Sequence, residues 1–156
     1  KFAQAISDHG GSGVITPDLT VEESEGWIAA TDASGINRIY VVAPSTSDSR
    51  LPIVTSKCGG FVYAASMMGV TGTRSSVSSS AAELVARVRT TTDTPISVGL
   101  GVSNREQARS VAGYADGVIV GSAFINALLE APDEAAGLRA VKELARELAL
   151  GVREGR

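Results

Sequence analysis

Three glycine-rich segments are the parts of this sequence best suited to chemistry. They are Gly69-Val70-Thr71-Gly72, Gly99-Leu100-Gly101 and Gly121-Ser122, and each follows a short apolar run. Glycine lets backbone amides approach an anion closely, and a helix N-terminus adds unpaired N–H groups with a favourable dipole. Together the three segments predict a phosphate-binding site. The alternative is three ordinary connections between strands and helices.

Five short apolar runs, each followed by a helical pattern, must position these glycines, and they indicate successive β-α units. The expected strands are residues 13–18, 38–43, 61–65, 96–99 and 117–120. The expected helices are residues 2–6, 21–33, 49–57, 81–91 and 105–112, a short one after Ser122, and residues 134–152. Thr20 is the expected N-cap of the helix 21–33, because a threonine hydroxyl accepts hydrogen bonds from first-turn amides.

The number of β-α units decides between two architectures. A (β/α)8 TIM barrel needs eight units in roughly 250 residues, so five units in 156 residues correspond to its strands four to eight. The alternative is a complete, open, five-stranded doubly wound sheet. The glycine segments follow the last three expected strands, where barrels place phosphate sites. We therefore predict an α/β fold in which residues 1–156 form a single domain, a partial barrel lacking the first three β-α units, with strands parallel and in sequence order.

Composition limits the possible partners. The net charge is −3 and no long basic block occurs, so a nucleic acid is not expected as a partner. No signal peptide appears, and no apolar run approaches the roughly 18 residues of a membrane span, so no membrane association is expected. The single cysteine, Cys58, fits a reducing cytoplasm. No spacing of His, Cys, Asp or Glu suggests a metal site, and no cofactor is expected.

A few single residues allow two interpretations each. A carboxylate that ends a barrel strand points at the active-site rim, so Asp18 is a candidate contact to the site or to a partner subunit, and the alternative is that it touches neither. The connection 67–80 is rich in small residues and is either a lid over a substrate or a plain solvated connection. His9, the only histidine, lies in a helix C-cap sequence, and a capping role is expected rather than catalysis.

The segments together resemble the tryptophan synthase α subunit, in its actinobacterial form. The resemblance rests on Phe61-Val62-Tyr63, on Gly-Val-Thr-Gly at 69–72, on residues 99–103 (Gly-Leu-Gly-Val-Ser) and on residues 115–123 (Ala-Asp-Gly-Val-Ile-Val-Gly-Ser-Ala). Pro17-Asp18-Leu19 also fits the end of that family's fourth strand. The resemblance covers nearly all of this chain but only about the last three-fifths of the family's barrel.

The resemblance implies a carbon–carbon lyase of tryptophan biosynthesis. Such an enzyme cleaves indole-3-glycerol phosphate by a retro-aldol reaction into indole and glyceraldehyde 3-phosphate. It also implies a cytoplasmic location and a tryptophan synthase β subunit as partner in an α2β2-type complex. The implied phosphate contacts are Gly72, Gly101, Gly121 and Ser122. The implied wall of the indole pocket is Gly99 and Leu100, and the implied supporting residues of the active site are Tyr63 and Thr71.

The same resemblance leaves the catalytic machinery incomplete. The family's catalytic Glu and Asp lie on its second strand and on the loop that follows, so no catalytic residue is expected in this chain. The chain alone is therefore expected to be inactive. Met67 and Met68 stand where many members carry a polar or basic residue, and Leu100 replaces the usual Phe. Loop electrostatics and indole packing are expected to differ for that reason.

Two alternatives stay open at this point. The first is another phosphate-binding barrel enzyme, such as an indole-glycerol-phosphate synthase or a phosphosugar epimerase. The epimerase needs metal-binding histidines that this chain lacks, and the synthase does not carry Gly-Val-Thr-Gly. The second is a non-catalytic barrel fragment that only binds phosphate or a partner. Lys1 is not an initiator Met, which is compatible with a fragment, a processed product or part of something longer.

Overall fold

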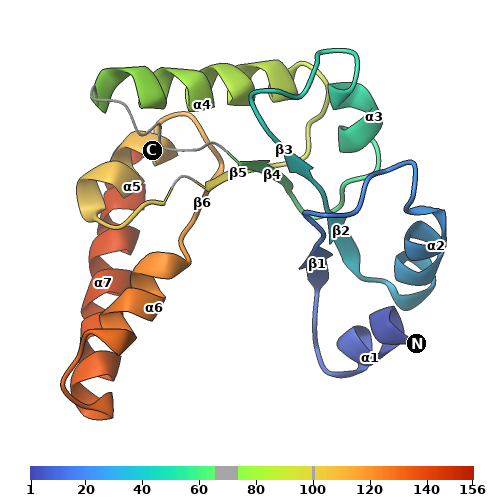
Figure 1. Cartoon of the computed structure of the whole chain (residues 1–156). Helices are drawn as coiled ribbons and strands as arrows, with labels where there is room; N and C mark the ends of the chain where they lie inside the picture. Colours follow the sequence, from blue (N-terminus) through green and yellow to red (C-terminus); the bar gives the residue numbers. More distant parts are fainter. Residues whose placement is uncertain (66–73, 100) are drawn as a thin grey trace. The chain divides into compact units, whose positions relative to one another are not determined.

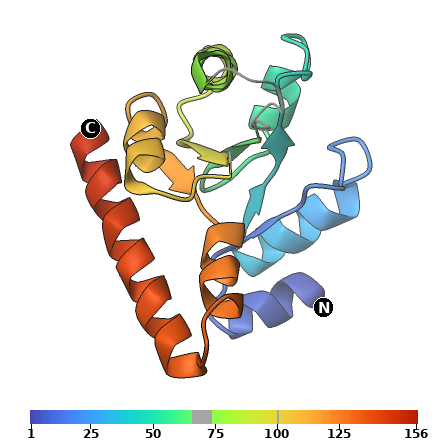
Figure 2. The ribbon, with the colours of Figure 1, turned by 60° about the vertical axis from the view of Figure 1, so that its left-hand side comes forward.

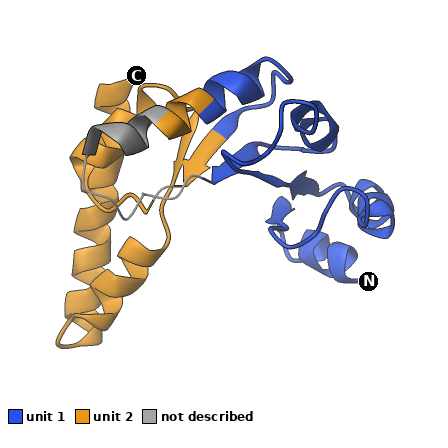
Figure 3. Cartoon of the chain, turned by 45° about the horizontal axis from the view of Figure 1, so that its top comes forward, with its two compact units in different colours: residues 1–65, 84–96 blue, residues 66–83, 97–156 orange. Residues whose placement is uncertain are grey.

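The structure is a computed structural model that describes residues 1–65, 74–99 and 101–156, with the side chains of 74–79 left out (Figure 1). Backbone contacts divide the chain into two compact units. Unit 1 comprises residues 1–65 and 84–96, and unit 2 comprises residues 66–83 and 97–156 (Figure 3). The expectation that residues 1–156 form a single domain stays a prediction.

The elements alternate between strand and helix, as expected for β-α units. Unit 1 contains α1 (Phe2–Asp8), β1 (Gly13–Ile15), α2 (Glu25–Ser34), β2 (Asn37–Ile39), β3 (Val41–Val42), α3 (Leu51–Thr55) and β4 (Val62–Ala65). The chain passes between the units within α4 (Arg74–Arg89) and within β5 (Ile96–Gly99). Unit 2 continues with α5 (Arg105–Ala112), β6 (Gly117–Ile119), α6 (Ser122–Leu129) and α7 (Glu134–Gly155).

Every described strand pair is parallel, and neighbouring strands in each sheet are consecutive in the chain, as predicted. In unit 1, β1 pairs with β2, and β3 pairs with β4, where Val41 lies opposite Tyr63. In unit 2, β5 pairs with β6, where Gly99 lies opposite Ile119. The strand order has no reversal, so it fits a barrel arc rather than a doubly wound sheet.

The expected strand 38–43 is divided at Tyr40, and this part of the prediction is wrong. Its first half, β2, pairs with β1, and its second half, β3, pairs with β4. The Tyr40 carbonyl still accepts a hydrogen bond from the Tyr63 N–H at 3.2 Å, so the backbone stays close to β4. Tyr40 therefore lies between two strand pairings, each of which uses one half of the expected strand.

The start of α2 also differs from the prediction. The helix begins at Glu25 with Ser24 as its N-cap residue, not at residue 21 behind Thr20. Ser24 is fully buried, accepts a hydrogen bond from the Tyr40 hydroxyl at 2.7 Å and donates one to the Val21 carbonyl at 2.8 Å. The Thr20 hydroxyl donates to the Glu23 carboxylate instead. The buried tyrosine contact therefore holds the preceding segment in a turn.

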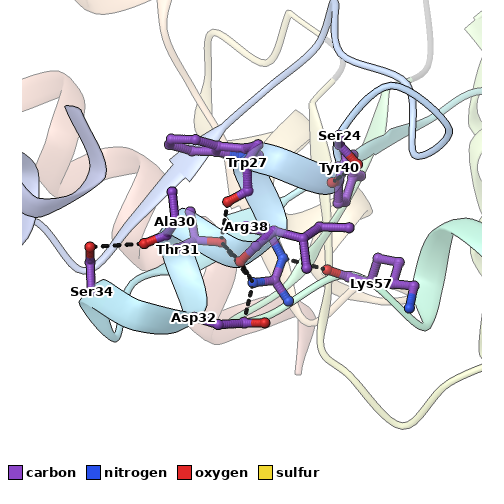
Figure 4. Close-up of polar contacts among 10 residues, drawn as sticks. Ser24, Trp27, Ala30, Thr31, Asp32, Ser34, Arg38, Tyr40 and Lys57 are labelled. Atoms are coloured by element: carbon purple, nitrogen blue, oxygen red, sulfur yellow. Dashed lines mark hydrogen bonds and ion pairs between the residues drawn. The ribbon is translucent and has the colours of Figure 1, made fainter. Parts of the chain in front are cut away.

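Arg38 on β2 ties α2 to the end of α3, as the close-up in Figure 4 shows. Its Nη1 donates to the Thr31 hydroxyl at 2.7 Å and pairs with the Asp32 carboxylate. Its Nε donates to the Lys57 carbonyl at 3.3 Å. The side chain is only 15% exposed, so these partners replace the water that the guanidinium loses on burial.

In unit 2 the long helix α7 lies beside α5 and α6 (Figure 2). Gly151 and Gly155, one turn apart on α7, face the backbone of α5. A Cβ added to Gly151 would collide with the Arg105 carbonyl oxygen, and one on Gly155 would collide with the Arg109 carbonyl oxygen. The helices therefore approach so closely that only glycine fits at these two positions.

We expect Gly151→Ala to reduce the free energy of unfolding by about 1–3 kcal/mol, because the added methyl group must push α7 away from α5. The loss should appear although alanine favours a helix over glycine by about 1 kcal/mol. The matched control is Gly26→Ala in α2, where a Cβ meets nothing within 4 Å. That variant should gain stability. Urea unfolding measures both, and an equally stabilised Gly151→Ala variant would contradict the close helix contact.

Candidate functional site

The predicted phosphate contacts that the structure describes lie in unit 2, in two connections after neighbouring strands. Gly101 lies between β5 and α5, Gly121 lies between β6 and α6, and Ser122 is the first residue of α6. Because β5 and β6 are parallel and paired, both connections leave the sheet at the carboxyl ends of the strands. All three residues are exposed. The chain therefore offers two neighbouring backbone segments to a ligand on this edge of unit 2.

The N-terminus of α6 has the features of an anion site. Its N-cap residue is Gly121, and no side-chain cap bond is formed there. The Gly121 carbonyl accepts from the Phe124 N–H at 3.0 Å, while a Cβ built on Gly121 meets nothing within 4 Å. A bare helix N-terminus presents N–H groups and a partial positive charge to solvent. An anion can approach these groups without displacing protein atoms.

The N-terminus of α5, in contrast, is capped by the chain itself. The Asn104 side chain accepts from the Gln107 N–H at 3.0 Å, and the Gln107 side chain accepts from the Ser103 N–H at 2.8 Å. This arrangement satisfies one first-turn donor, the Gln107 N–H, and the N–H of Ser103, the residue before the N-cap. Among the described residues of the connection to α5, which are 101–104, Gly101 alone has a positive φ, of +70° in the left-handed region. That geometry favours glycine.

Tyr63 and Gly99, which the resemblance also singles out, lie on strands. Tyr63 is on β4 in unit 1 and is half-buried, between the buried Val62 and Ala64. Successive side chains of a strand point to opposite faces, so Tyr63 lies on the face opposite to these two core residues. Gly99, the last residue of β5, is half-buried in unit 2. Thr71, Gly72 and Leu100 lie outside the residues that the structure describes, as do Met67 and Met68.

Charged side chains tie together the loops that follow β1 and β3 in unit 1. Arg50 forms a bidentate ion pair with Glu22, with N–O distances of 2.9 and 2.7 Å. The hydrogen bonds from Arg50 lower the pKa of the Glu22 carboxyl group. Arg87 on α4 donates to the Asp48 carboxylate at 2.7 Å. Sequence analysis missed both pairs, because partners 28 and 39 residues apart leave no local pattern.

Several other residues have simple structural roles. His9 is the C-cap residue of α1, as predicted, and its Nδ1 lies 2.7 Å from the Ala5 carbonyl oxygen. Cys58 is partly buried, and burial raises the pKa of its thiol. Asp18 is exposed.

Within the described ranges, no three His, Cys, Asp or Glu side chains come together as a metal site. No helix in those ranges is both long and apolar enough to cross a membrane.

Comparison with known proteins gives one consistent result. Residues 1–153 match the family model described as tryptophan synthase alpha chain. The tryptophan synthase alpha chain of Streptomyces coelicolor is 57% identical over 153 residues, which cover 98% of this chain and 56% of the relative. That of Mycobacterium ulcerans is 51% identical over 153 residues, covering 98% of this chain and 55% of the relative. The chain thus spans little more than half the length of these relatives.

Solved structures show the same similarity in the fold. A Mycobacterium tuberculosis tryptophan synthase structure superposes with a TM-score of 0.86 at 49% identity, over 97% of this chain and 56% of the matched chain. A mutant tryptophan synthase alpha-subunit from Pyrococcus furiosus gives a TM-score of 0.78 at 29% identity, over 95% of this chain and 59% of the other. The partial α/β barrel expected from the sequence is therefore confirmed.

Proposed function

Because the chain belongs to the tryptophan synthase alpha chain family, we propose that it forms the phosphate-binding part of a lyase. The proposed reaction is the retro-aldol cleavage of indole-3-glycerol phosphate into indole and glyceraldehyde 3-phosphate. The observation that carries this proposal is the family match over residues 1–153, together with the uncapped N-terminus of α6. Gly101, Gly121 and Ser122 are the proposed phosphate contacts described by the structure.

The phosphate site would act on the reaction from a distance. Binding energy from a part of the substrate that does not react can hold the reacting end in position. Gly101 and the first turn of α6 would supply backbone N–H groups for this purpose, since glycine allows the closest approach. We further propose Gly72 as a phosphate contact, Gly99 and Leu100 as pocket wall, and Tyr63 and Thr71 as supporting residues.

The chemical step itself needs two groups that transfer protons, one at the indole ring and one at the glycerol hydroxyl. In the family these are a Glu and an Asp on the second strand and the loop after it, outside the part that this chain matches. This chain would therefore bind and orient the substrate, and the acid–base pair would come from the remaining β-α units of the barrel. No cofactor enters this proposal.

We also propose a tryptophan synthase β subunit as partner and the cytoplasm as location. The similarity to structures of Mycobacterium tuberculosis tryptophan synthase supports the partner. The location is supported by the biosynthetic role of the family and by a single cysteine that forms no disulfide within this chain.

A chimera tests the proposed function. In it, this chain replaces the matched 56% of the Streptomyces coelicolor relative, whose remaining part supplies the other β-α units. We expect the chimera to release indole from indole-3-glycerol phosphate within about tenfold of the relative's own kcat/KM, because the residues of both parts belong to one family. The control is the relative's remaining part alone, which should be inactive. A folded chimera without turnover would overturn the proposal.

A further inference from the structure

The guanidinium of Arg87 holds the loop that follows β3. From α4, its Nε donates to the Asp48 carboxylate at 2.7 Å, and its Nη1 donates to the Pro44 carbonyl at 3.2 Å. Its Nη2 donates to the Thr46 carbonyl. All three partners belong to loop 43–50, and all these residues are in unit 1. One rigid, planar cation therefore fixes the loop at three points through a fork of three nitrogen atoms, whereas a lysine has a single donor nitrogen.

Loop 43–50 begins at the carboxyl end of β3, beside the strand that carries Tyr63. Val41 and Val42 of β3 pair with Tyr63 and Ala64 of β4, so the loop leaves the sheet next to the end of β4. Active sites of parallel barrels lie at this end of the strands. At the other end of the loop, Arg50 is held by Glu22, so the loop is anchored on both sides.

We infer that Arg87 is a positioning residue for the substrate site of the proposed lyase. It keeps loop 43–50 in a single conformation at the carboxyl end of β3, so that the wall of the site beside Tyr63 is formed before the substrate binds. This inference rests on the proposed function. A loop that must become ordered on binding weakens the affinity for the ligand, and Arg87 removes that cost in advance.

The Streptomyces coelicolor chimera provides the kinetic test. Arg87→Ala should raise the KM for indole-3-glycerol phosphate about tenfold and change kcat less than about threefold, because loop 43–50 must then become ordered on binding while the acid–base groups are unaffected. Arg87→Lys should give a KM between that of the parent chimera and that of Arg87→Ala. A lysine can keep the Asp48 ion pair, but its single nitrogen atom replaces the three donor nitrogens of the guanidinium. Asp48→Asn removes only the ion pair and provides a milder second variant should Arg87→Ala fail to fold.

Arg38→Ala is the matched structural control. Arg38 also ties a helix to a neighbouring segment of unit 1, but Thr31 lies within α2 and Lys57 lies just after α3, so neither partner is at the carboxyl end of a strand. It should lower the melting temperature and leave KM unchanged. If the Arg87 variants lowered the melting temperature while KM stayed at the parent value, Arg87 would have a purely structural role and the inference would be wrong.

Hydrogen exchange in the same chimera gives a readout that does not depend on turnover. The N–H groups of Thr46 and Arg50 donate within the loop, to Ala43 and Ser47. Arg87→Ala should increase their exchange rates about tenfold, whereas the Tyr63 N–H, held by the sheet, should be unchanged. Unchanged exchange at Thr46 and Arg50 would overturn the inference even in an active chimera. A parent chimera without turnover would instead refute the proposed function.

Discussion

Gly121→Asp is expected to weaken the binding of glycerol 3-phosphate by about 100-fold while the protein stays folded. The phosphate would otherwise accept hydrogen bonds from the first turn of α6, where Gly121 is the N-cap residue. The new carboxylate carries the same sign of charge as the phosphate. It can also accept hydrogen bonds from the same N–H groups, since aspartate is among the preferred N-cap residues. The ligand therefore loses its donors and meets a repulsive charge.

The fold should tolerate this change for reasons visible at the site. The φ of Gly121 is −128°, outside the left-handed region, and a Cβ there meets nothing within 4 Å. An aspartate N-cap also stabilises a helix, so the melting temperature should stay level or rise slightly. Loss of affinity then reports on the site rather than on unfolding.

The measurement is calorimetric titration of the Streptomyces coelicolor chimera with glycerol 3-phosphate. Gly121→Ala is the matched control, because it adds the Cβ without the charge and should weaken binding far less than Gly121→Asp. Equal affinity of the parent and of Gly121→Asp would remove Gly121 from the phosphate site. A similar loss in both variants would show that the close approach of the backbone matters more than the charge.

The features that could be predicted from the sequence are those determined by local patterns. The five β-α units were predictable because buried strands of Val and Ile alternate with helical segments. The bounds of α5 were also accessible, since a helix was expected over residues 105–112 and the helix covers Arg105–Ala112. The start of α2 was not, because it depends on the hydroxyl of Tyr40, which is 16 residues from Ser24 in the sequence.

The long-range ion pairs of unit 1 show more clearly which contacts cannot be predicted from local sequence patterns. Glu22 was interpreted as a first-turn helix residue, although its carboxylate is bound by Arg50, 28 residues further along the chain. Arg87 was an unremarkable position in a helical pattern, and only folding brings it to loop 43–50. Long-range ion pairs depend on the path of the backbone between them, so a single sequence contains no signal that identifies the partner.

The 156-residue polypeptide alone is expected to release no indole from indole-3-glycerol phosphate above background. The family's acid–base pair lies outside the residues that this chain matches, and each such group contributes about 10²–10⁴-fold to the rate. The proposed phosphate contacts, the glycines and Ser122, can transfer no proton at the indole ring. An assay on polypeptide of confirmed mass measures this directly, and clear turnover would show that the catalytic residues have been assigned wrongly.

The same polypeptide should also associate with itself, because surfaces that a closed barrel covers are open. Among the described residues, β1 and β6 each pair on one side only. Ile15 on β1 is 42% exposed, and Leu129 on α6 is 77% exposed. An apolar pocket of about 220 Å³ lies in unit 2, lined by Ala108, Val118, Val120, Phe124, Leu148, Ala149 and Val152. Unpaired strand edges and uncovered apolar surface favour association.

Adding the remaining segment of the Streptomyces coelicolor relative as a separate polypeptide should end the self-association and restore indole release. That segment would pair with the free strand edges, cover the pocket beside Phe124 and supply the acid–base pair, so a barrel closed in this way has no edges left. We expect the apparent mass to fall to that of a one-to-one complex and indole release to appear with it. Size-exclusion chromatography with light scattering, followed by the indole assay on each fraction, tests both at once. A one-to-one complex without activity would indicate that closing the barrel does not assemble the site.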